Sequence, residues 1–309
     1  MSAKTASVTP VLALLLATTW GCSPALVAFS APCSPAGPVQ LLPPEIGESS
    51  GIVASRARPG LFWTHNDASG DGPLFLVDLR GVLVEAVRLE GAFVRDWEDL
   101  AIGPCGPDGR GSCLYLADTG DNAERRDDSA IYRLPEPTPG ATKTGAAERF
   151  ALRFPNGPRD VEAMFILPDE RLFLVTKGRN DPVELYRVPP FPTVAGAQLS
   201  AGPLLLERIQ TLTEDSPPLP RWITGGSASP DGRLVALRSY ETLQLYRPDA
   251  DGRLAPVPEG LMNLRVVGEV QGEGVAFAPE GDLVLTSEAR PLGGRGTIAT
   301  LRCQGTDPA

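Results

Sequence analysis

The sequence predicts an all-β fold, a β-propeller of about five four-stranded blades, from its turn residues and from a repeated pattern. Gly (33) and Pro (32) are scattered among short apolar runs in the 309 residues, as frequent turns between short strands require. Three segments align without gaps, each an apolar strand, a Pro-Asp or Pro-Glu turn and a second apolar strand: 162–177, 224–239 and 273–288. Such regular copies predict a repeat architecture.

Two looser copies precede them and complete the set of repeats. Segment 48–52 leads to a strand at 61–67, and segment 98–102 leads to a strand at 114–122. Third apolar strands follow at 73–78, 131–134, 184–187 and 243–246, and each is followed by a further apolar strand. Four strands in roughly 50 to 64 residues match one propeller blade. Six blades stay possible, because the long interval from 98 to 162 has room for irregular strands.

The chain ends predict how the ring closes. The last repeat has room for three strands before Cys303, so we expect residues 39–42 to supply its fourth strand. We therefore expect one propeller domain (38–304), an N-terminal tether (22–37) and a short tail (305–309).

The first 21 residues have the pattern of an export signal, one lysine followed by an apolar run at 11–17 that is too short to span a membrane. We expect an exported protein without a transmembrane segment, either periplasmic, secreted, or lipid-anchored to the cell envelope through Cys22.

The five cysteines agree with export. If Cys22 carries a lipid, the other four form an even set in a compartment that permits disulfides. Cys105 and Cys113 flank a hairpin-length loop, while Cys33 and Cys303 lie near opposite ends of the domain. We predict these two pairs, and the alternative is four free thiols packed as small apolar residues.

The net charge of −10 disfavours nucleic acid and anionic membranes as partners. A cation, a small molecule or a carbohydrate is the more natural ligand, and we expect a monomer.

The repeat register predicts an acidic site. The first strand of each blade lines the central channel, so residues at equivalent repeat positions become neighbours. Oxygen ligands without thiolates suit Ca²⁺ or Mg²⁺, and Ca²⁺ is the expected cofactor. The candidate metal ligands are Glu48, Asp96, Glu98, Asp118, Glu162 and Glu273. Alternatively, these carboxylates accept backbone N–H bonds and cap turns between blades.

Other candidates could act on a substrate beside this cluster. His65 is the only histidine, and together with Asp67 and Glu98 it could provide acid–base catalysis. The alternative is a neutral histidine that lines the channel, and the absence of a Gly-x-Ser-x-Gly motif favours it. Lys177 and Arg238 could bind an anionic substrate group or only neutralise carboxylates. Trp97 and Trp222 could form a platform for a ring or pack between blades.

The motifs around these residues resemble a group of exported bacterial propeller proteins. That group carries Glu-Ser-Ser-Gly-[Ile/Leu], Trp-Thr-His-Asn-Asp-x-Gly-Asp, Arg-Asp-Trp-Glu-Asp-[Ile/Leu]-Ala and Asp-x-Gly-Asp-Asn. Here these motifs stand at 48–52, 63–71 (with one residue added), 95–101 and 118–122. More widely, the chain resembles phytase-like esterase, senescence-marker and gluconolactonase propellers, which implies a central Ca²⁺ and hydrolysis of phosphoesters or lactones.

Three functions are compatible with these features. The first is a metal-dependent hydrolase of a phosphoester, ester or lactone. The second is a five-bladed glycosidase with two carboxylates flanking the scissile bond. The third is a non-catalytic ligand-binding or scaffold propeller, since fold alone does not fix function.

Overall fold

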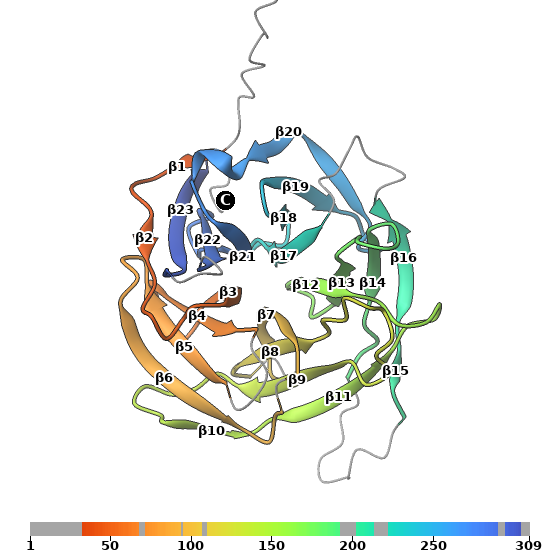
Figure 1. Ribbon diagram of the computed structural model, residues 1–309. Coiled ribbons are helices and arrows are strands. Elements are labelled where there is room, and N and C mark those ends of the chain that lie inside the picture. The colour runs from red at the N-terminus through yellow and green to blue at the C-terminus, as the bar shows by residue number, and fades with distance from the viewer. Residues whose placement is uncertain are drawn as a thin grey trace, which may run out of the picture.

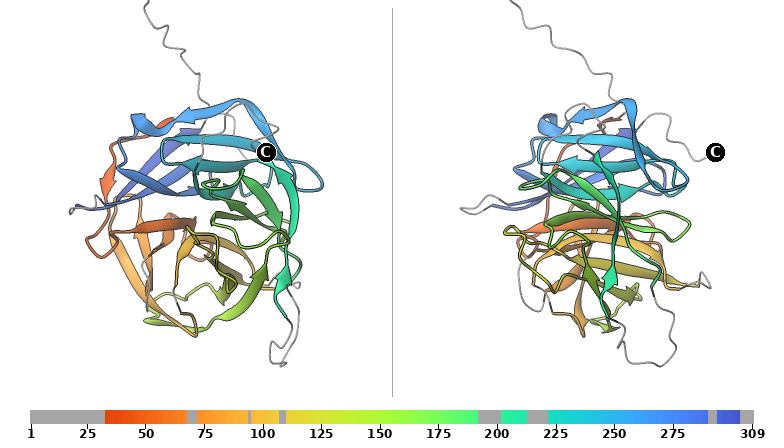
Figure 2. Two further views of the ribbon diagram at one scale, coloured as in Figure 1. Left: turned by 45° about the vertical axis from the view of Figure 1, so that its right-hand side comes forward. Right: turned by 90° about the vertical axis from the view of Figure 1, so that its right-hand side faces the viewer.

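The computed structural model arranges the chain as five sheets around a central channel (Figure 1). It describes residues 33–67, 72–93, 95–106, 110–191, 202–212, 222–289 and 294–303. The expected export signal, Cys22 and the tail 305–309 lie outside these ranges. Figure 1 shows that the blades follow one another around the axis in chain order, and Figure 2 shows the same ribbon from two further directions.

In each blade the first strand lies at the channel and the later strands lie progressively farther out. Blade 1 consists of β3 (Ser49–Ala54), β4 (Leu61–Asn66), β5 (Pro73–Asp78) and β6 (Leu83–Glu90). Blade 2 consists of β7 (Trp97–Pro104), β8 (Ser112–Asp118), β9 (Ala130–Pro135) and β11 (Glu148–Arg153). Blade 3 consists of β12 (Val161–Ile166), β13 (Leu172–Thr176), β14 (Glu184–Arg187) and β16 (Glu207–Thr211).

Blade 4 consists of β17 (Ile223–Ala228), β18 (Val235–Ser239), β19 (Thr242–Pro248) and β20 (Leu254–Asn263), and the short 3₁₀ turn η1 (Leu264–Val266) follows it. Blade 5 consists of β21 (Gln271–Phe277), β22 (Leu283–Glu288) and β23 (Thr297–Cys303), completed by β1 (Cys33–Pro35) and β2 (Gln40–Leu41). The predicted all-β propeller is confirmed, because all five repeat starts fall within two residues of the first residues of β3, β7, β12, β17 and β21.

The structure settles the number of blades at five. The long interval after residue 98 contains β10 (Lys143–Ala146), which pairs parallel to β6 and so extends blade 1 instead of forming a sixth blade. A similar addition, β15 (Leu204–Leu205), pairs parallel to β11 on the outer edge of blade 2.

The N-terminal segment closes the ring, as predicted. Strand β2 pairs antiparallel with the start of β23, and β1 pairs antiparallel with its end, where Cys33 is opposite Cys303. The disulfides Cys33–Cys303 and Cys105–Cys113 both form. Two disulfides are typical of proteins that fold in an oxidising compartment outside the cytoplasm. No helix within the described ranges is long and apolar enough to span a membrane.

The apolar core lies between the blades. Within the described residues it forms five buried clusters, one at each contact between neighbouring blades. The inner strands approach closely at glycines: a Cβ at Gly51 would lie 2.4 Å from the backbone nitrogen of Leu100, and one at Gly274 would lie 2.4 Å from Ser50 O. Side chains at these two positions would push neighbouring blades apart.

We predict that the closing disulfide stabilises the fold more than the hairpin disulfide does. Cys33–Cys303 links residues 270 apart, whereas Cys105–Cys113 links residues 8 apart. In the loop-entropy model the double variant C33S/C303S should lose about 2–3 kcal/mol more unfolding free energy than C105S/C113S. Urea denaturation of both variants tests this, and equal losses would contradict it.

Candidate functional site

The leading ends of the inner strands bring acidic side chains together at one end of the channel. We call this group the acidic mouth, and its members lie close enough that their charges shift one another's pKa. It consists of Glu48, Asp67, Asp96, Glu98, Asp160, Glu162, Lys177, Tyr240, Glu273 and Glu288. The register of the repeats therefore placed these residues as neighbours although they are far apart in sequence.

The centre of the acidic mouth is formed by Glu98, Glu162 and Lys177. The Lys177 ammonium donates a hydrogen bond of 2.5 Å to Glu162 Oε1, and all three side chains are buried. The carboxyl groups of Glu98 and Glu162 hydrogen-bond to each other. Burial and the neighbouring Glu162 raise the pKa of Glu98 well above its usual value. Burial also raises the pKa of Glu162, but the positive charge of Lys177 lowers it, and the resulting pKa is about 7. Burial therefore favours the protonated form of Glu98, whereas Glu162, with Lys177 beside it, ionises near neutral pH.

Two further acids lie on the blade 5 side of the mouth. Burial raises the pKa of Glu273 to about 9, and burial with nearby carboxylates raises that of Glu288 to about 7. The Gln271 amide donates to both carboxyl groups, at 2.9 Å and 2.8 Å. Glu273 is therefore a neutral acid at pH 7.

On the blade 1 side, burial and the charges of Glu48 and Asp96 raise the pKa of Asp67 to about 6. Glu48 itself is exposed, and its backbone N–H donates to Asn66 Oδ1.

The Asp-Thr-Gly-Asp-Asn segment after β8 forms a wall of the mouth. A Cβ at Gly120 would lie 2.0 Å from Glu98 Oε1 and 2.6 Å from Asp96 Oδ2, so a side chain here would displace both carboxyl groups. Asp118 forms a buried ion pair with Arg126 at 2.8 Å and also accepts the backbone N–H of Asp96. Asp118 thus holds the segment in place. This matches the alternative in which the acids accept backbone N–H groups instead of binding a metal.

His65 lies behind the mouth in the core. Its ring is fully buried and packs against the edge of Trp97, with ring centroids 5.8 Å apart. Nδ1 hydrogen-bonds to Asn66 O, and burial lowers the pKa of His65 to about 4. His65 is therefore neutral at pH 7.

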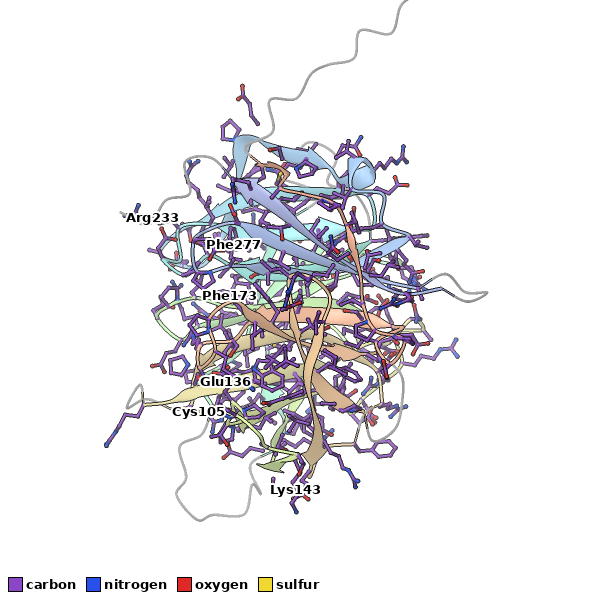
Figure 3. The ribbon with its side chains drawn as sticks, turned by 90° about the vertical axis from the view of Figure 1, so that its left-hand side faces the viewer. Cys105, Glu136, Lys143, Phe173, Arg233 and Phe277 are labelled. Carbon is purple, nitrogen blue, oxygen red and sulfur yellow. A yellow bond between two sulfur atoms is a disulfide. The ribbon has the colours of Figure 1, made fainter. Side chains whose placement is uncertain are left out.

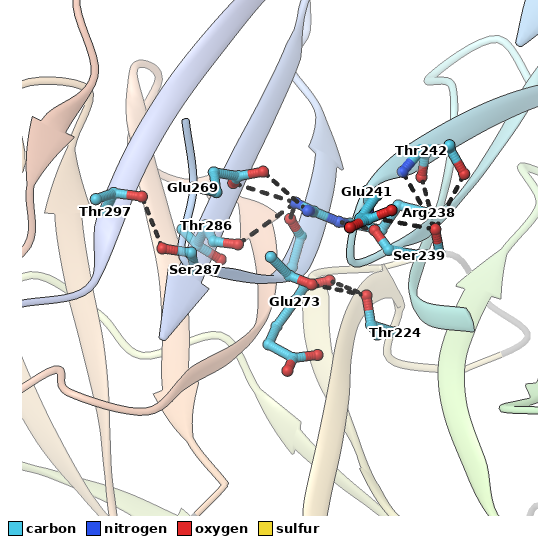
Figure 4. A network of polar contacts seen from close by, with 12 residues as sticks. Thr224, Arg238, Ser239, Glu241, Thr242, Glu269, Glu273, Thr286, Ser287 and Thr297 are labelled. Carbon is cyan, nitrogen blue, oxygen red and sulfur yellow. Dashed lines mark hydrogen bonds and ion pairs between the residues drawn. The ribbon is translucent and has the colours of Figure 1, made fainter. Parts of the chain in front are cut away.

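Arg238, expected to face a substrate, lies in a buried ion pair. Its guanidinium binds both carboxylate oxygens of Glu269, at 2.9 Å and 3.3 Å, and donates to the backbone oxygens of Gly274 and Thr286 (Figure 4). Its exposed fraction is 0%. Arg238 therefore links blades 4 and 5, and this geometry fits the charge-neutralising alternative.

The two tryptophans occupy different environments. Trp97 is completely buried between blades 1 and 2, where it packs against Tyr132 and cannot stack on a ligand. Trp222 is 45% exposed and meets the ring of Tyr240 edge-on, with centroids 6.2 Å apart. The centroid of the Tyr240 ring also lies 5.9 Å from the Lys177 ammonium nitrogen. The accessible aromatic surface at the mouth is therefore the pair Trp222–Tyr240.

The described side chains do not fit a preformed Ca²⁺ centre. No three His, Cys, Asp or Glu side chains among them are arranged to hold a metal ion. The Lys177 ammonium already supplies positive charge at the centre of the cluster, and Arg126 pairs with Asp118.

Asp99 lies at the middle of the channel. The sequence placed it beside Glu98 among the positions that enter the mouth, but assigned it no role. Its buried carboxylate accepts hydrogen bonds from the backbone N–H groups of Leu100 (2.8 Å), Met164 (2.7 Å) and Gly226 (3.1 Å). These groups belong to blades 2, 3 and 4, so one side chain crosses the channel. The sequence signal is only its position next to Glu98, since no repeat partner shares it.

Sequence comparison identifies no family model that matches this chain, and no curated protein matches it. Among solved structures, the chain is similar to the calcium-binding protein regucalcin from Agrobacterium tumefaciens, with 18% identity, 89% of this chain and 96% of that chain covered, and a TM-score of 0.49. A PQQ-bound aldose sugar dehydrogenase from Streptomyces coelicolor has 13% identity, coverages of 87% and 97%, and a TM-score of 0.48. A luciferin-regenerating enzyme has 13% identity, coverages of 84% and 80%, and a TM-score of 0.47. Likenesses at this level assign no activity to this chain.

We predict that Asp99→Ala destabilises the fold. It leaves the N–H groups of Met164 and Gly226 buried without an acceptor, at a cost of about 2–6 kcal/mol in unfolding free energy. Asp169→Ala, in an exposed turn of blade 3, is the control and should change stability by about 0.5 kcal/mol or less. Urea denaturation measures both, and a small loss for Asp99→Ala would show that the channel crossing is not needed.

We also predict that stability falls as the pH rises from 5 to 9. The pKa of Glu273 is about 9 in the folded protein and 4.5 in its ordinary state, so the folded protein binds more protons across this window. The stability that protonated Glu273 contributes is fully present below about pH 4.5 and is lost as the pH approaches 9. Thermal unfolding should show a shallower decline for Glu273→Gln, whereas Glu280→Gln, at an exposed turn, should follow the wild type.

Proposed function

We propose that this protein is a hydrolase of an uncharged ester or lactone, with Glu98 and Glu162 as its acid–base pair. The observation that carries this proposal is the buried Glu98–Glu162–Lys177 arrangement, in which the Lys177 ammonium binds Glu162 and favours its ionised form, while burial raises the pKa of Glu98 well above its usual value. Two carboxyl groups whose pKa values are pushed apart are the usual basis for dividing acid and base duties.

The pair supplies both proton transfers of ester hydrolysis. Ionised Glu162 takes a proton from water as the water oxygen attacks the carbonyl carbon, and Glu98 gives its proton to the leaving oxygen as the carbon–oxygen bond breaks. Glu162 is then protonated and Glu98 ionised, and transfer along their hydrogen bond restores the starting state. Lys177 contacts Glu162 and favours its ionised form, so Lys177 acts as a positioning residue.

Charge favours an uncharged substrate over an anionic one. The cations expected to bind an anionic group are both engaged, since Lys177 pairs with Glu162 and Arg238 with Glu269. A phosphoester would also meet repulsion from the surrounding carboxylates. Trp222 and Tyr240 offer an aromatic surface against which a ring can pack.

A glycoside is the second candidate substrate class, because the same aromatic surface suits a sugar ring. Two hydrogen-bonded carboxyl groups lie too close together to flank a glycosidic bond, so a glycosidase would use a different pair of acids from the acidic mouth. A panel of p-nitrophenyl acetate, aliphatic lactones, p-nitrophenyl glycosides and p-nitrophenyl phosphate separates these classes. Binding of a panel compound without turnover would favour the non-catalytic propeller.

We predict that Glu98→Gln lowers kcat about 100-fold or more on an ester or lactone, because the amide keeps the hydrogen bond to Glu162 but has no proton to give. The wild-type rate should rise with pH near 7, as Glu162 ionises, and fall at higher pH as Glu98 loses its proton. Turnover should persist in EDTA. Glu280→Gln is the matched control, and full activity of Glu98→Gln would refute the assignment.

A further inference from the structure

The channel has a second chamber at the end opposite the acidic mouth. A cavity of about 590 Å³ is lined by the last residues of all five inner strands and by the turns that follow them. Leu100, Met164 and Gly226, whose N–H groups bind Asp99, form part of its wall. The Asp99 carboxylate therefore lies where this cavity meets the interior of the channel. Figure 3 shows the wheel from the side, with Phe277 of the cavity wall and Glu136 toward the same end.

The rim of this cavity is built from the repeat itself. Each blade contributes one proline from the turn or strand end after its inner strand: Pro59, Pro104, Pro168, Pro230 and Pro279. Proline has a fixed φ and no N–H group, so these positions form a rigid rim without backbone donors. A preformed rim lowers the entropy cost of binding an apolar ligand.

The wall is apolar except at a few points. Arg56 is the single charged residue among the lining residues, in a protein whose net charge is −10. The residue is exposed, and its partly buried guanidinium donates to Ile102 O at 3.3 Å, in the wall of the cavity. Ser227 accepts the backbone N–H of Phe277 at 3.1 Å, which leaves its hydroxyl hydrogen to donate. Ser55 and Ser229 donate to Glu136 and Asp231.

We propose that this cavity binds a small amphiphile with one carboxylate, its apolar body lying against the strand ends and its carboxylate on Arg56. The volume falls within the range of small-molecule sites, which are mostly apolar with a few polar groups that fix orientation. Burial of each methylene of the ligand strengthens binding, and the guanidinium supplies a charge-assisted hydrogen bond. This inference does not depend on the hydrolase proposal.

Titration calorimetry with octanoate tests the proposal on the full chain. Octanoate should bind saturably at one site. Arg56→Gln should weaken octanoate binding about tenfold or more, as expected for loss of a hydrogen bond between charged groups. The same substitution should leave octan-1-ol binding unchanged, and octylammonium should bind more weakly than octanoate.

Filling the cavity gives an independent check. Ala228 and Ala54 lie in the wall on blades 4 and 1, and Ala228→Phe or Ala54→Phe should abolish binding of both octanoate and octan-1-ol. Near-UV circular dichroism confirms that each variant is folded, and two separate variants guard against one misfolding. Glu98→Gln should leave octanoate binding intact, since it alters the other chamber.

Three outcomes would overturn the proposal. They are the absence of saturable octanoate binding, octanoate binding unaffected in folded Ala228→Phe and Ala54→Phe, and loss of binding in Glu98→Gln, which would place the ligand in the acidic mouth. Equal affinity for octylammonium would remove the assignment of the charge to Arg56.

Discussion

Both ends of the channel depend on the hydrogen bonds that the buried carboxyl group of Asp99 accepts. It accepts backbone N–H groups from blades 3 and 4 while belonging to blade 2, so it fixes the spacing of three inner strands. Close approach of neighbouring inner strands at Gly51 and Gly274 continues this tight packing around the ring. Because the inner strands cannot shift independently, the acids at their leading ends are held together and the apolar residues at their far ends line one cavity.

Holding so many carboxyl groups near one axis is possible because the fold handles their charge in two ways. Some are ionised and paired with a buried cation, as Asp118 is with Arg126 and Glu162 with Lys177. Others have raised pKa values and stay protonated, as Glu98 and Glu273 do. A buried charge without a partner costs far more than either arrangement. The mixture of ionised and neutral acids follows from this need, and it also creates a site that can both accept and donate protons.

The sequence predicted what is repeated and missed what is particular to one blade. Repeat spacing identified the inner strands and the grouping of acids, because cyclic closure turns equivalent positions into neighbours. It did not identify Glu269 as the partner of Arg238, because Glu269 lies before β21, outside the aligned positions. It also could not separate Trp97 from Trp222. Both residues sit beside a leading position, but one points between blades and the other stands in a loop with φ of 71°.

The departure of blade 4 from the repeat gives the acidic mouth its direction. Where the other blades carry a leading glutamate, blade 4 carries Thr224, whose hydroxyl hydrogen-bonds to the backbone oxygens of Gly272 and Glu273. The same blade supplies both Trp222 and Tyr240. The ring of acids is thus interrupted on one side by an uncharged strand and an aromatic surface. A ligand that approached along the axis would meet carboxyl groups on four sides and an apolar surface on the fifth, so its ring would lie toward blade 4 and its polar bond toward Glu98 and Glu162. A strictly symmetric wheel has no such preferred orientation, so any preferred orientation of a ligand in the acidic mouth arises from the one blade that breaks the pattern.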